Sequence, residues 1–487
     1  MCGRSGGIDE KNLTNEKTPE FIGCFFALGV DIPSETRYNA LKGITFKEDK
    51  IMLKAGFARV DVTPPLGSPL AGYFYERVSD GVLDPIQLNA IAYTDGESTA
   101  IIIASDFIGM DLEHCTEVRE LINERTGIAA DHIMISCLHQ HTSLRIGGKG
   151  YAEFNDSVYM NLLYRKYADV AQMAVNDMSD ATVGTAEARA LEDIAFVRRY
   201  WLEDGSVATN PSRKGPKPVR RCDESDNTVR IIRFKREGKK DIAYVNFSTH
   251  PDTVSGTKFS ADWPGFVRRK VEAQIDNTVC LCHVGCQGDS NHCDYFKPTL
   301  EEMYPYGVHY PHTEYMGRVI VDTVKTIWDK TVEHTEHKVY GGFDIIYNRT
   351  NTEGEEKYEE CKKFYDDYNA GKFDPKPHIT ILAYNRRIIG LRTSPIYRPV
   401  PVTVLGLGDI AFVGFGGEPF THYTIATKEA AGDKKTVFCS CVTNGNQGYL
   451  PHARAFEEGG YEAASSFFTP CLEDQCIAAA KKMLDQF

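Results

Sequence analysis

The chain has 487 residues, of which 42% are hydrophobic and 25% are charged, as in a soluble globular protein with a sizeable core. Its formal net charge of −13 makes nucleic acid and anionic lipid headgroups poor partners. We expect no secretory leader, because the N-terminus lacks a basic region followed by an apolar core, and no transmembrane segment, because the apolar run at residues 21–30 is too short to cross a bilayer. The 14 cysteines lack the spacing of a disulfide or zinc-knuckle framework, which favours a reducing, cytoplasmic location. The oligomeric state is left open.

The start of the chain differs in character from the rest. Residues 1–54 are polar and rich in turn formers, and we predict an N-terminal extension there. An alternating strand follows and ends at Pro64 and Pro65, where the missing backbone donors stop a ladder. Residues 55–487 are predicted to form one domain.

Three stretches of this domain share one order of elements. Each has a strand, a turn, an apolar strand ending in a polar residue, a helix, and a buried strand ending in polar residues. The elements are expected at 88–93, 99–105, 112–125 and 133–137; at 229–234, 242–247, 266–274 and 279–284; and at 402–405, 410–415, 423–431 and 437–442. This order predicts a mixed α/β fold, with mixed β-sheets flanked by helices.

Polar residues follow the C-terminal ends of the apolar strands in every unit. If the strands share sheets, these ends meet at one rim, which is where α/β proteins bind ligands. The residues expected at this rim are Asp106, His139, His141, His250, Asp289, Glu418 and Tyr449. Residues 355–370 are predicted to form a charged helix packed by one face, the alternative being a lid over a substrate.

His139 and His141 stand one residue apart at the end of a short apolar strand. Alternation along extended backbone places both imidazoles on the same side. Two imidazoles at a strand end could ligate a metal or act in acid/base chemistry. The alternative is that a backbone carbonyl satisfies each ring, as happens wherever this short pattern occurs by chance.

Six short motifs occur along the chain. They are Ala55-Gly-Phe-Ala-Arg-Val-Asp-Val-Thr-Pro-Pro, Cys137-Leu-His-Gln-His-Thr-Ser, Asn246-Phe-Ser-Thr-His-Pro, Gly288-Asp, Gly417-Glu-Pro-Phe, and Gln447-Gly-Tyr-Leu-Pro with the following Glu458-Gly-Gly-Tyr-Glu. In this order they resemble the catalytic domain of the neutral/alkaline, non-lysosomal ceramidase family, over roughly residues 54–487. That family consists of zinc-dependent amidases that split the N-acyl bond of ceramide, so the resemblance implies zinc as cofactor.

The resemblance implies a metal set. His139, His250, Glu418 and Tyr449 match the zinc ligands, and His141 matches the histidine of acid/base catalysis. Two imidazoles and a carboxylate also form a catalytic zinc set on chemical grounds, since they leave coordination open for water. A phenol has a pKa of about 10, so Tyr449 would bind a metal only as the phenolate.

Four further residues are expected around the metal set. Tyr461 and Arg198 match groups that stabilise the oxyanion in the resembling family. Asp106 and Asp289 are expected to orient the ligand histidines, the alternative being that they cap strand ends and form turns.

The chain departs from the family pattern on the substrate side. The family sequence His-x-His-Ser-Gly-Pro continues here as Thr142-Ser-Leu, and Asn291 stands at the position of a family serine, with Ser290 one residue early. The family's C-terminal β-sandwich domain is not expected. The predicted function is hydrolysis of the N-acyl amide of ceramide or a related lipid-like N-acyl substrate. The alternatives are the same chemistry on another small-molecule amide, ester or acylated sugar, and a non-catalytic binding protein.

Overall fold

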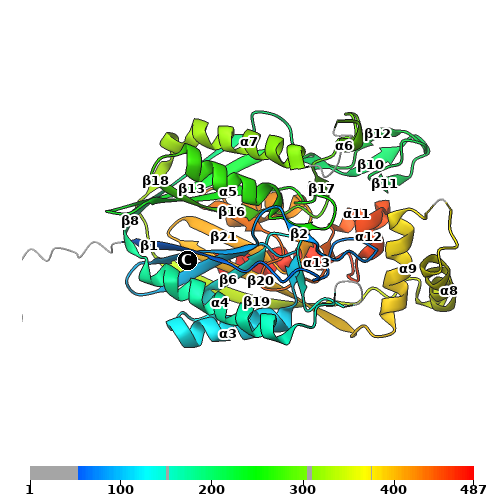
Figure 1. The fold of residues 1–487 in the computed structure, drawn as a ribbon, viewed down its shortest axis with the longest axis horizontal. Coiled ribbons are helices and arrows are strands. Elements are labelled where there is room, and N and C mark those ends of the chain that lie inside the picture. The colour runs from blue at the N-terminus through cyan, green and yellow to red at the C-terminus, as the bar shows by residue number, and fades with distance from the viewer. Residues whose placement is uncertain (1–52, 150–152, 304–309, 375, 487) are drawn as a thin grey trace, which may run out of the picture. The chain divides into compact units, whose positions relative to one another are not determined.

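The computed structural model describes residues 53–149, 153–303, 310–374 and 376–486. The predicted extension therefore lies outside the described residues except at its end, where Lys54 opens the first strand. Across the described part of the chain, no helix combines the length and apolarity needed to cross a bilayer. Figure 1 shows the helices and strands of this part.

The larger sheet contains nine strands within the described residues, and both parallel and antiparallel pairs occur in it. In pairing order its strands are β16 (Thr278–Val284), β14 (Asp241–Phe247), β13 (Thr228–Arg236), β8 (Ser179–Arg189), β1 (Lys54–Asp61), β3 (Gln87–Thr94), β4 (Thr99–Ser105) and β6 (Ile133–Cys137), with β18 (Val332–His334) against β8.

A second sheet has four strands in the order β19 (Val339–Arg349), β20 (Tyr397–Leu407), β21 (Ile410–Phe415) and β23 (Thr436–Ser440). Short pairings complete the strand set: β11 (Val207–Thr209), β10 (Arg199–Leu202) and β12 (Pro218–Arg221) in one ribbon, and the pairs β15 (Lys258–Phe259) with β2 (Gly81–Val82), β17 (Ser290–Asn291) with β9 (Phe196–Val197), β22 (Glu418–Pro419) with β24 (Tyr449–Leu450), and β5 (Gly109–Met110) with β7 (Arg145–Ile146).

The helices lie outside these sheets. They are α3 (Leu112–Thr126), α4 (Ser157–Asn176), α5 (Asp262–Gln274), α6 (Leu300–Met303), α7 (Tyr310–Ile327), α8 (Tyr358–Asn369), α9 (Ile379–Leu391), α10 (His422–Ala431), α11 (Ala453–Glu458), α12 (Tyr461–Ser465) and α13 (Leu472–Leu484), with single 3₁₀ turns η1 (Ala130–His132), η3 (Trp328–Lys330) and η4 (Glu355–Lys357).

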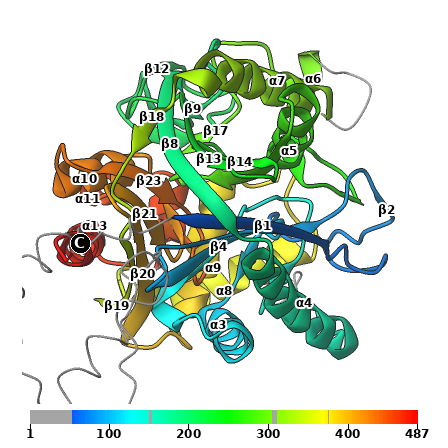
Figure 2. The same ribbon diagram turned by 90° about the vertical axis from the view of Figure 1, so that its left-hand side faces the viewer.

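Helices and sheets are arranged in layers. Helices α5 and α7 contact β16, β13 and β8, α4 contacts β1 and β3, and α3 lies against α4. Helices α10 and α13 contact the four-stranded sheet, so each sheet has helices on its outer side (Figure 2). The inner faces of the two sheets meet through aromatic rings: Phe412 lies 6.1 Å from Tyr93 and 5.4 Å from Tyr244 between centroids. The mixed α/β prediction is confirmed.

The three predicted units are present and share one geometry. In each, an antiparallel hairpin is followed by a helix and a strand parallel to the second hairpin strand: β3, β4, α3 and β6; β13, β14, α5 and β16; β20, β21, α10 and β23. The parallel pairs place the carboxyl ends of their strands together, which brings the following loops to one region. Strands such as β4 are buried along both faces, as parallel pairing requires.

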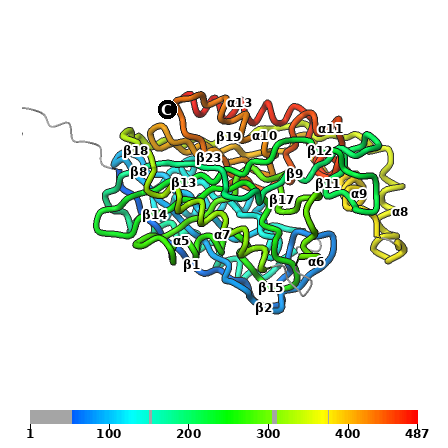
Figure 3. The backbone as a smooth tube through the Cα atoms, turned by 90° about the horizontal axis from the view of Figure 1, so that it is seen from above, coloured from blue at the N-terminus to red at the C-terminus, as the bar shows by residue number. Residues whose placement is uncertain are grey.

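The structure adds elements that the sequence pattern did not predict. Between the first and second units, residues 196–221 form the short strands β9 to β12. Between the second and third units, residues 339–349 form the strand β19, which pairs along the whole of β20. Figures 1 and 3 place β9 to β12 and the helices α8 and α9 at the same end of the domain. The charged helix is α8, whose Cys361 is buried against Ile388 and Leu391, as predicted for a helix packed by one face.

Candidate metal centre

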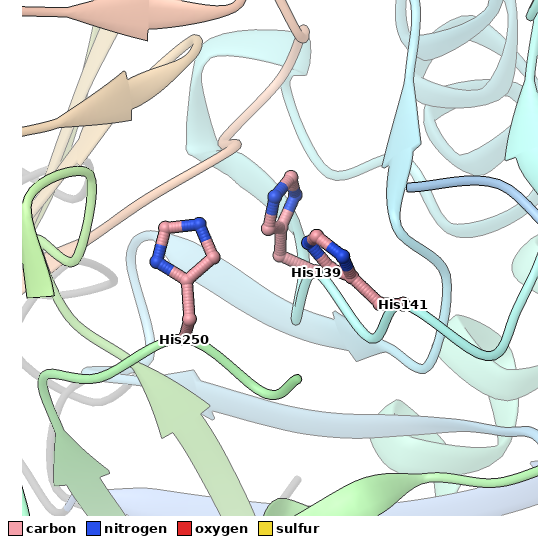
Figure 4. Close-up of side chains that lie close together, drawn as sticks. All are labelled: His139, His141 and His250. Carbon is pink, nitrogen blue, oxygen red and sulfur yellow. The ribbon is translucent and has the colours of Figure 1, made fainter. Parts of the chain in front are cut away.

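Three histidines meet where strands of the nine-stranded sheet end. His139 and His141 follow β6, and His250 follows β14. One ring nitrogen from each lies within 4.8 Å of the others, and all three residues are buried (Figure 4). Their ring centroids are 5.2 to 5.8 Å apart, so the rings are grouped around one point.

The backbone holds His139 in an unusual conformation. Its φ is +70°, in the left-handed region that a residue with a side chain seldom occupies. Its amide donates to the carbonyl of Phe107 (3.0 Å), and its Nδ1 lies 2.7 Å from the carbonyl oxygen of Ile108. With the proton on Nδ1 for that bond, Nε2 keeps its lone pair, which is available to a cation.

His250 has the same arrangement. Its Nδ1 lies 2.8 Å from the carbonyl oxygen of Gln287 and 2.9 Å from that of Ser290, in the loop after β16. Burial lowers the pKa of His250 to about 4, so the ring is neutral at physiological pH. A backbone carbonyl therefore satisfies one nitrogen of each ring, as the alternative interpretation expected, but in both rings the other nitrogen remains available.

Glu418 brings a carboxylate to the two free nitrogens. Its Oε2 lies 3.2 Å from Nε2 of His139 and 3.4 Å from Nε2 of His250. Burial raises the pKa of Glu418, but the two imidazoles outweigh it and hold the pKa well below its usual range. Behind it Gly288 packs so closely that a Cβ there would overlap the carbonyl oxygen of Glu418.

His141 is buried beside this pair, and neither of its ring nitrogens has a hydrogen-bond partner among the described residues. Its Nδ1 lies 3.5 Å from Oδ1 of Asp252, and burial lowers its pKa well below the usual value. Arg77 fixes the loop by donating to the backbone carbonyl of His141. Gly72 lies against the ring, and a Cβ there would stand 2.7 Å from Nδ1.

Tyr449 lies beside Glu418 because its strand β24 pairs with the strand β22 that contains Glu418. Its hydroxyl accepts a hydrogen bond from Nη2 of Arg198 (3.0 Å), and burial raises the pKa of Tyr449 well above its ordinary value. Arg198 also donates through Nε to the fully buried Glu462 (2.7 Å). Tyr461 lies 5.3 Å from Tyr449 between ring centroids, and burial raises its pKa to about 12.

Asp106 and Asp289 have direct partners other than the histidine rings. Asp106 binds Arg268 through both oxygens (2.9 and 2.6 Å), and Asp289 accepts from the amide and hydroxyl of Thr421. The histidine rings donate to main-chain carbonyls instead, so neither carboxylate orients them directly. Asp106 acts one step away, by accepting a hydrogen bond from the amide group of Gln140 between the two histidines (3.1 Å).

The donor set fits a cation. Nε2 of His250 and Oε2 of Glu418 approach each other without a hydrogen bond, and both atoms are buried. Buried polar atoms without partners are costly, and a metal ion would satisfy both. Imidazole and carboxylate are the ligand types that zinc takes in catalytic sites. His139, His141 and His250 therefore can hold a divalent metal together, and Glu418 brings a carboxylate oxygen to within 3.2 and 3.4 Å of Nε2 of His139 and His250.

Two polar neighbours of His141 were not singled out by the sequence patterns. The hydroxyl of Tyr73 donates to Oδ1 of Asp252 (2.6 Å), and the Tyr73 ring lies edge-on to His141 at 5.6 Å. A signal for Asp252 was available: it stands two residues after His250, as His141 stands two residues after His139. No comparable pattern marks Tyr73, which comes from a loop near the start of the domain.

Comparisons with known proteins support the fold. No protein-family model and no curated protein match this sequence. The structure is similar to that of neutral ceramidase from Pseudomonas aeruginosa, with a TM-score of 0.64 and 12% identity over 90% of this chain and 74% of that chain. A ceramidase complexed with C2 is similar at a TM-score of 0.62 and 12% identity, over 89% of this chain and 75% of that one. The resemblance predicted from the six motifs is thus confirmed at the level of the fold, which this chain shares with neutral ceramidase.

Proposed function

We propose that this protein is a zinc-dependent hydrolase that splits an N-acyl amide with a water molecule activated at the candidate metal centre. The observation that supports it most directly is the pair of buried imidazoles whose Nδ1 atoms are committed to carbonyls and whose Nε2 atoms face Glu418. This arrangement leaves donor atoms of the right chemistry without partners of their own.

A bound zinc ion supplies Lewis acidity, which lowers the pKa of water to roughly 7. His141, buried beside the ligands, is placed to take a proton from the nucleophile and deliver it to the leaving amine. Arg198 and Tyr461 are placed to stabilise negative charge that develops on the carbonyl oxygen, Arg198 through the hydroxyl of Tyr449 that it already contacts.

The substrate class rests on the comparisons. Both similar structures are ceramidases, so ceramide or a related N-acyl lipid is the first substrate to test. A second candidate is the same chemistry on another amide, an ester or an acylated sugar. One observation favours it: the cavity beside His141 is lined by charged and polar groups as well as by aromatic rings. A protein that binds a ligand without catalysis would have no need of the unpaired donors.

The first measurement is the metal content of the full chain purified without added metal, together with fatty-acid release from a short-chain ceramide. Near-stoichiometric zinc with turnover of an acyl amide is the expected result. A protein that neither contains a divalent metal nor takes one up on titration would refute the proposal. Bound metal without turnover of ceramide would still support the metal centre, and other acyl substrates would then be tested.

Three substitutions then assign the donors. His139→Ala should abolish both bound metal and turnover, because it removes a ligand. His141→Ala should retain metal and lose most turnover, a loss of about 10²–10⁴-fold for a general acid/base. Metal loss in His141→Ala would instead make that histidine a ligand, and unchanged metal affinity in Tyr449→Phe would exclude the phenol from the metal.

A further inference from the structure

A cavity of about 650 Å³ opens directly beside the candidate metal centre. We call it the side pocket, and its lining includes Tyr73, Asp252, Asn291 and the rings of Phe196, Tyr200 and Tyr295. A second cavity of the same volume lies at the opposite ends of the strands, by the β13–β14 turn, and its Arg236 and Lys239 are both bound to Asp177. Of these two cavities, the side pocket is therefore the one that adjoins the candidate metal centre.

The side pocket shares a wall with the centre. Tyr73 and Asp252 line it, and Oδ1 of Asp252 is 3.5 Å from Nδ1 of His141. On another wall, Asn291 lies in strand β17 next to Ser290, whose carbonyl accepts from His250. A group bound in the pocket is thus separated from His141 by Asp252 on one side, and from His250 by the strand of Ser290 and Asn291 on the other.

The lining combines aromatic rings with ionisable groups. The rings of Phe196, Tyr200 and Tyr295 form one side, with Tyr200 and Tyr295 6.1 Å apart between centroids. The carboxylates and cations along the lining are Asp193, Asp252, Asp294, Glu301, Arg213 and Lys297, and two histidines, His292 and His312, also line it. Among the described residues, neither Arg213 nor Lys297 forms a salt bridge: each donates to a backbone carbonyl and lies over a ring of the lining, Arg213 over Tyr295 (5.2 Å) and Lys297 over Phe196 (4.8 Å).

This composition disfavours an alkyl chain. A chain seated in the pocket would strip water from charged groups that it cannot hydrogen-bond, which costs free energy for each group. A polyhydroxylated ring meets both requirements at once. Its C–H face packs on the aromatic rings, while its hydroxyls bond the carboxylates, amides and cations of the wall. The volume lies within the range of pockets that hold small ligands, and suits a mono- or disaccharide.

We propose that the side pocket binds a sugar-like head, so that the substrate of this centre is an N-acyl amino sugar. The proposal rests on the hydrolytic function proposed above. In the reaction water adds to the acyl carbon and the C–N bond breaks; the nitrogen takes a proton and leaves as the free amine, while the acyl group leaves as the carboxylic acid. The amine-bearing ring occupies the side pocket beside His141, the group placed to protonate the nitrogen.

Binding and turnover are measured separately to test this. Binding of N-acetylglucosamine, N-acetylgalactosamine and the N-acetylglucosamine disaccharide is followed by saturation-transfer NMR and calorimetry on the full-length His139→Ala protein, or on chelator-treated wild type if that variant does not fold. Saturable binding of at least one sugar is expected. Tyr295→Ala should weaken it about tenfold or more without changing metal content, since it removes one aromatic face. Tyr347→Ala, at an exposed position on β19, is the matched control and should bind as wild type.

The outcomes separate this inference from the hydrolase proposal. No saturable sugar binding, or binding that Tyr295→Ala leaves unchanged, overturns the sugar head. Loss of ceramide turnover in Tyr295→Ala with no sugar bound would also overturn it and assign the pocket to a lipid. Sugar binding that depends on Tyr295, with release of acetate by the zinc-loaded wild type, supports both proposals. The same binding without release of acetate supports a sugar-binding pocket but overturns the N-acyl amino sugar as substrate, and the hydrolase proposal is then decided by the metal titration.

Discussion

The buried ion pair between Asp106 and Arg268 offers a quantitative test of how the histidine loop is supported. Both side chains are almost fully buried, at 0% and 2% exposure, and the two oxygens meet the guanidinium at 2.6 and 2.9 Å. Arg268→Met keeps the length of the side chain and removes its charge. The carboxylate is then left buried with only the amide of Gln87 and the side chain of Gln140 as donors.

The expected cost is large. Opposite charges about 4 Å apart in an effective dielectric of 20 attract by about 4 kcal/mol, and breaking a buried pair by removing one partner typically costs about 3–5 kcal/mol. Adding Asp106→Asn removes the stranded charge, so the double variant should regain all but roughly 1–2 kcal/mol. A residual loss remains because the amide has one acceptor oxygen where the carboxylate used two.

Urea unfolding followed by tryptophan fluorescence gives these free energies. Trp263 is fully buried on the same helix as Arg268, so it reports on this region. Arg189→Met is the control: its exposed pair with Asp193 should contribute less than about 1 kcal/mol. If the double variant is as unstable as Arg268→Met alone, the stranded charge is not the cause. Metal affinity should follow the same pattern, falling in the single variant and recovering in the double, because Gln140 joins the pair to the histidine loop.

Two further predictions concern Gly288 and His283. Gly288→Ala should weaken metal binding about 10–100-fold, because its Cβ would displace the backbone of Glu418. Gly215→Ala is the control, since the nearest atom to a Cβ there is 3.6 Å away, and it should bind metal as the wild type does. Equal metal affinities of the two variants in a competition titration would contradict this prediction. Burial lowers the pKa of His283 to about 3, from 6.5 for an exposed ring. The stability linked to this ring is complete above pH 6.5 and falls by up to roughly 5 kcal/mol as the pH drops toward 3, because the unfolded chain binds the extra proton. His283→Gln should flatten that part of the urea-midpoint profile, and parallel profiles for the two proteins would show that another group is responsible.

The strands and helices of the three units were predictable because their signals are local. Residues 99–105 and 133–137 are short apolar runs bounded by polar residues, and the structure places β4 and β6 at those bounds. That His139 and His250 end strands of one sheet was likewise predictable, whereas Glu418 follows a strand of the other sheet and reaches them through the packing of the two sheets. Strands β9 to β12 carry no comparable pattern, because β10 to β12 pair only with one another and β9 pairs with the two-residue strand β17, not with either large sheet.

The partners of Asp106 and Asp289 lay beyond the reach of the sequence pattern. The end of a strand fixes the position of each carboxylate but not its partner. Arg268, which binds Asp106 of the first unit, comes from a helix of the second, and Thr421, which binds Asp289 of the second unit, comes from the third. The orientation of the histidines was out of reach for a different reason. Main-chain carbonyls hold their Nδ1 atoms, and a carbonyl carries no residue identity that a sequence could display. Tyr73 and Asp252 meet only because two distant loops pack together.

The candidate ligands come from both sheets. His139 and His250 follow strands of the larger sheet, whereas Glu418 follows β21 of the smaller one. Neither sheet alone presents the full set, so the set exists only once the faces carrying Tyr244 and Phe412 have packed. A cation that binds the folded chain alone stabilises it by mass action, and here it would also cross-link segments distant in sequence. If a metal binds as proposed, assembly of the two sheets and metal binding would be one coupled equilibrium, and a change in the packing between the sheets would change the metal affinity without any contact to the ligands.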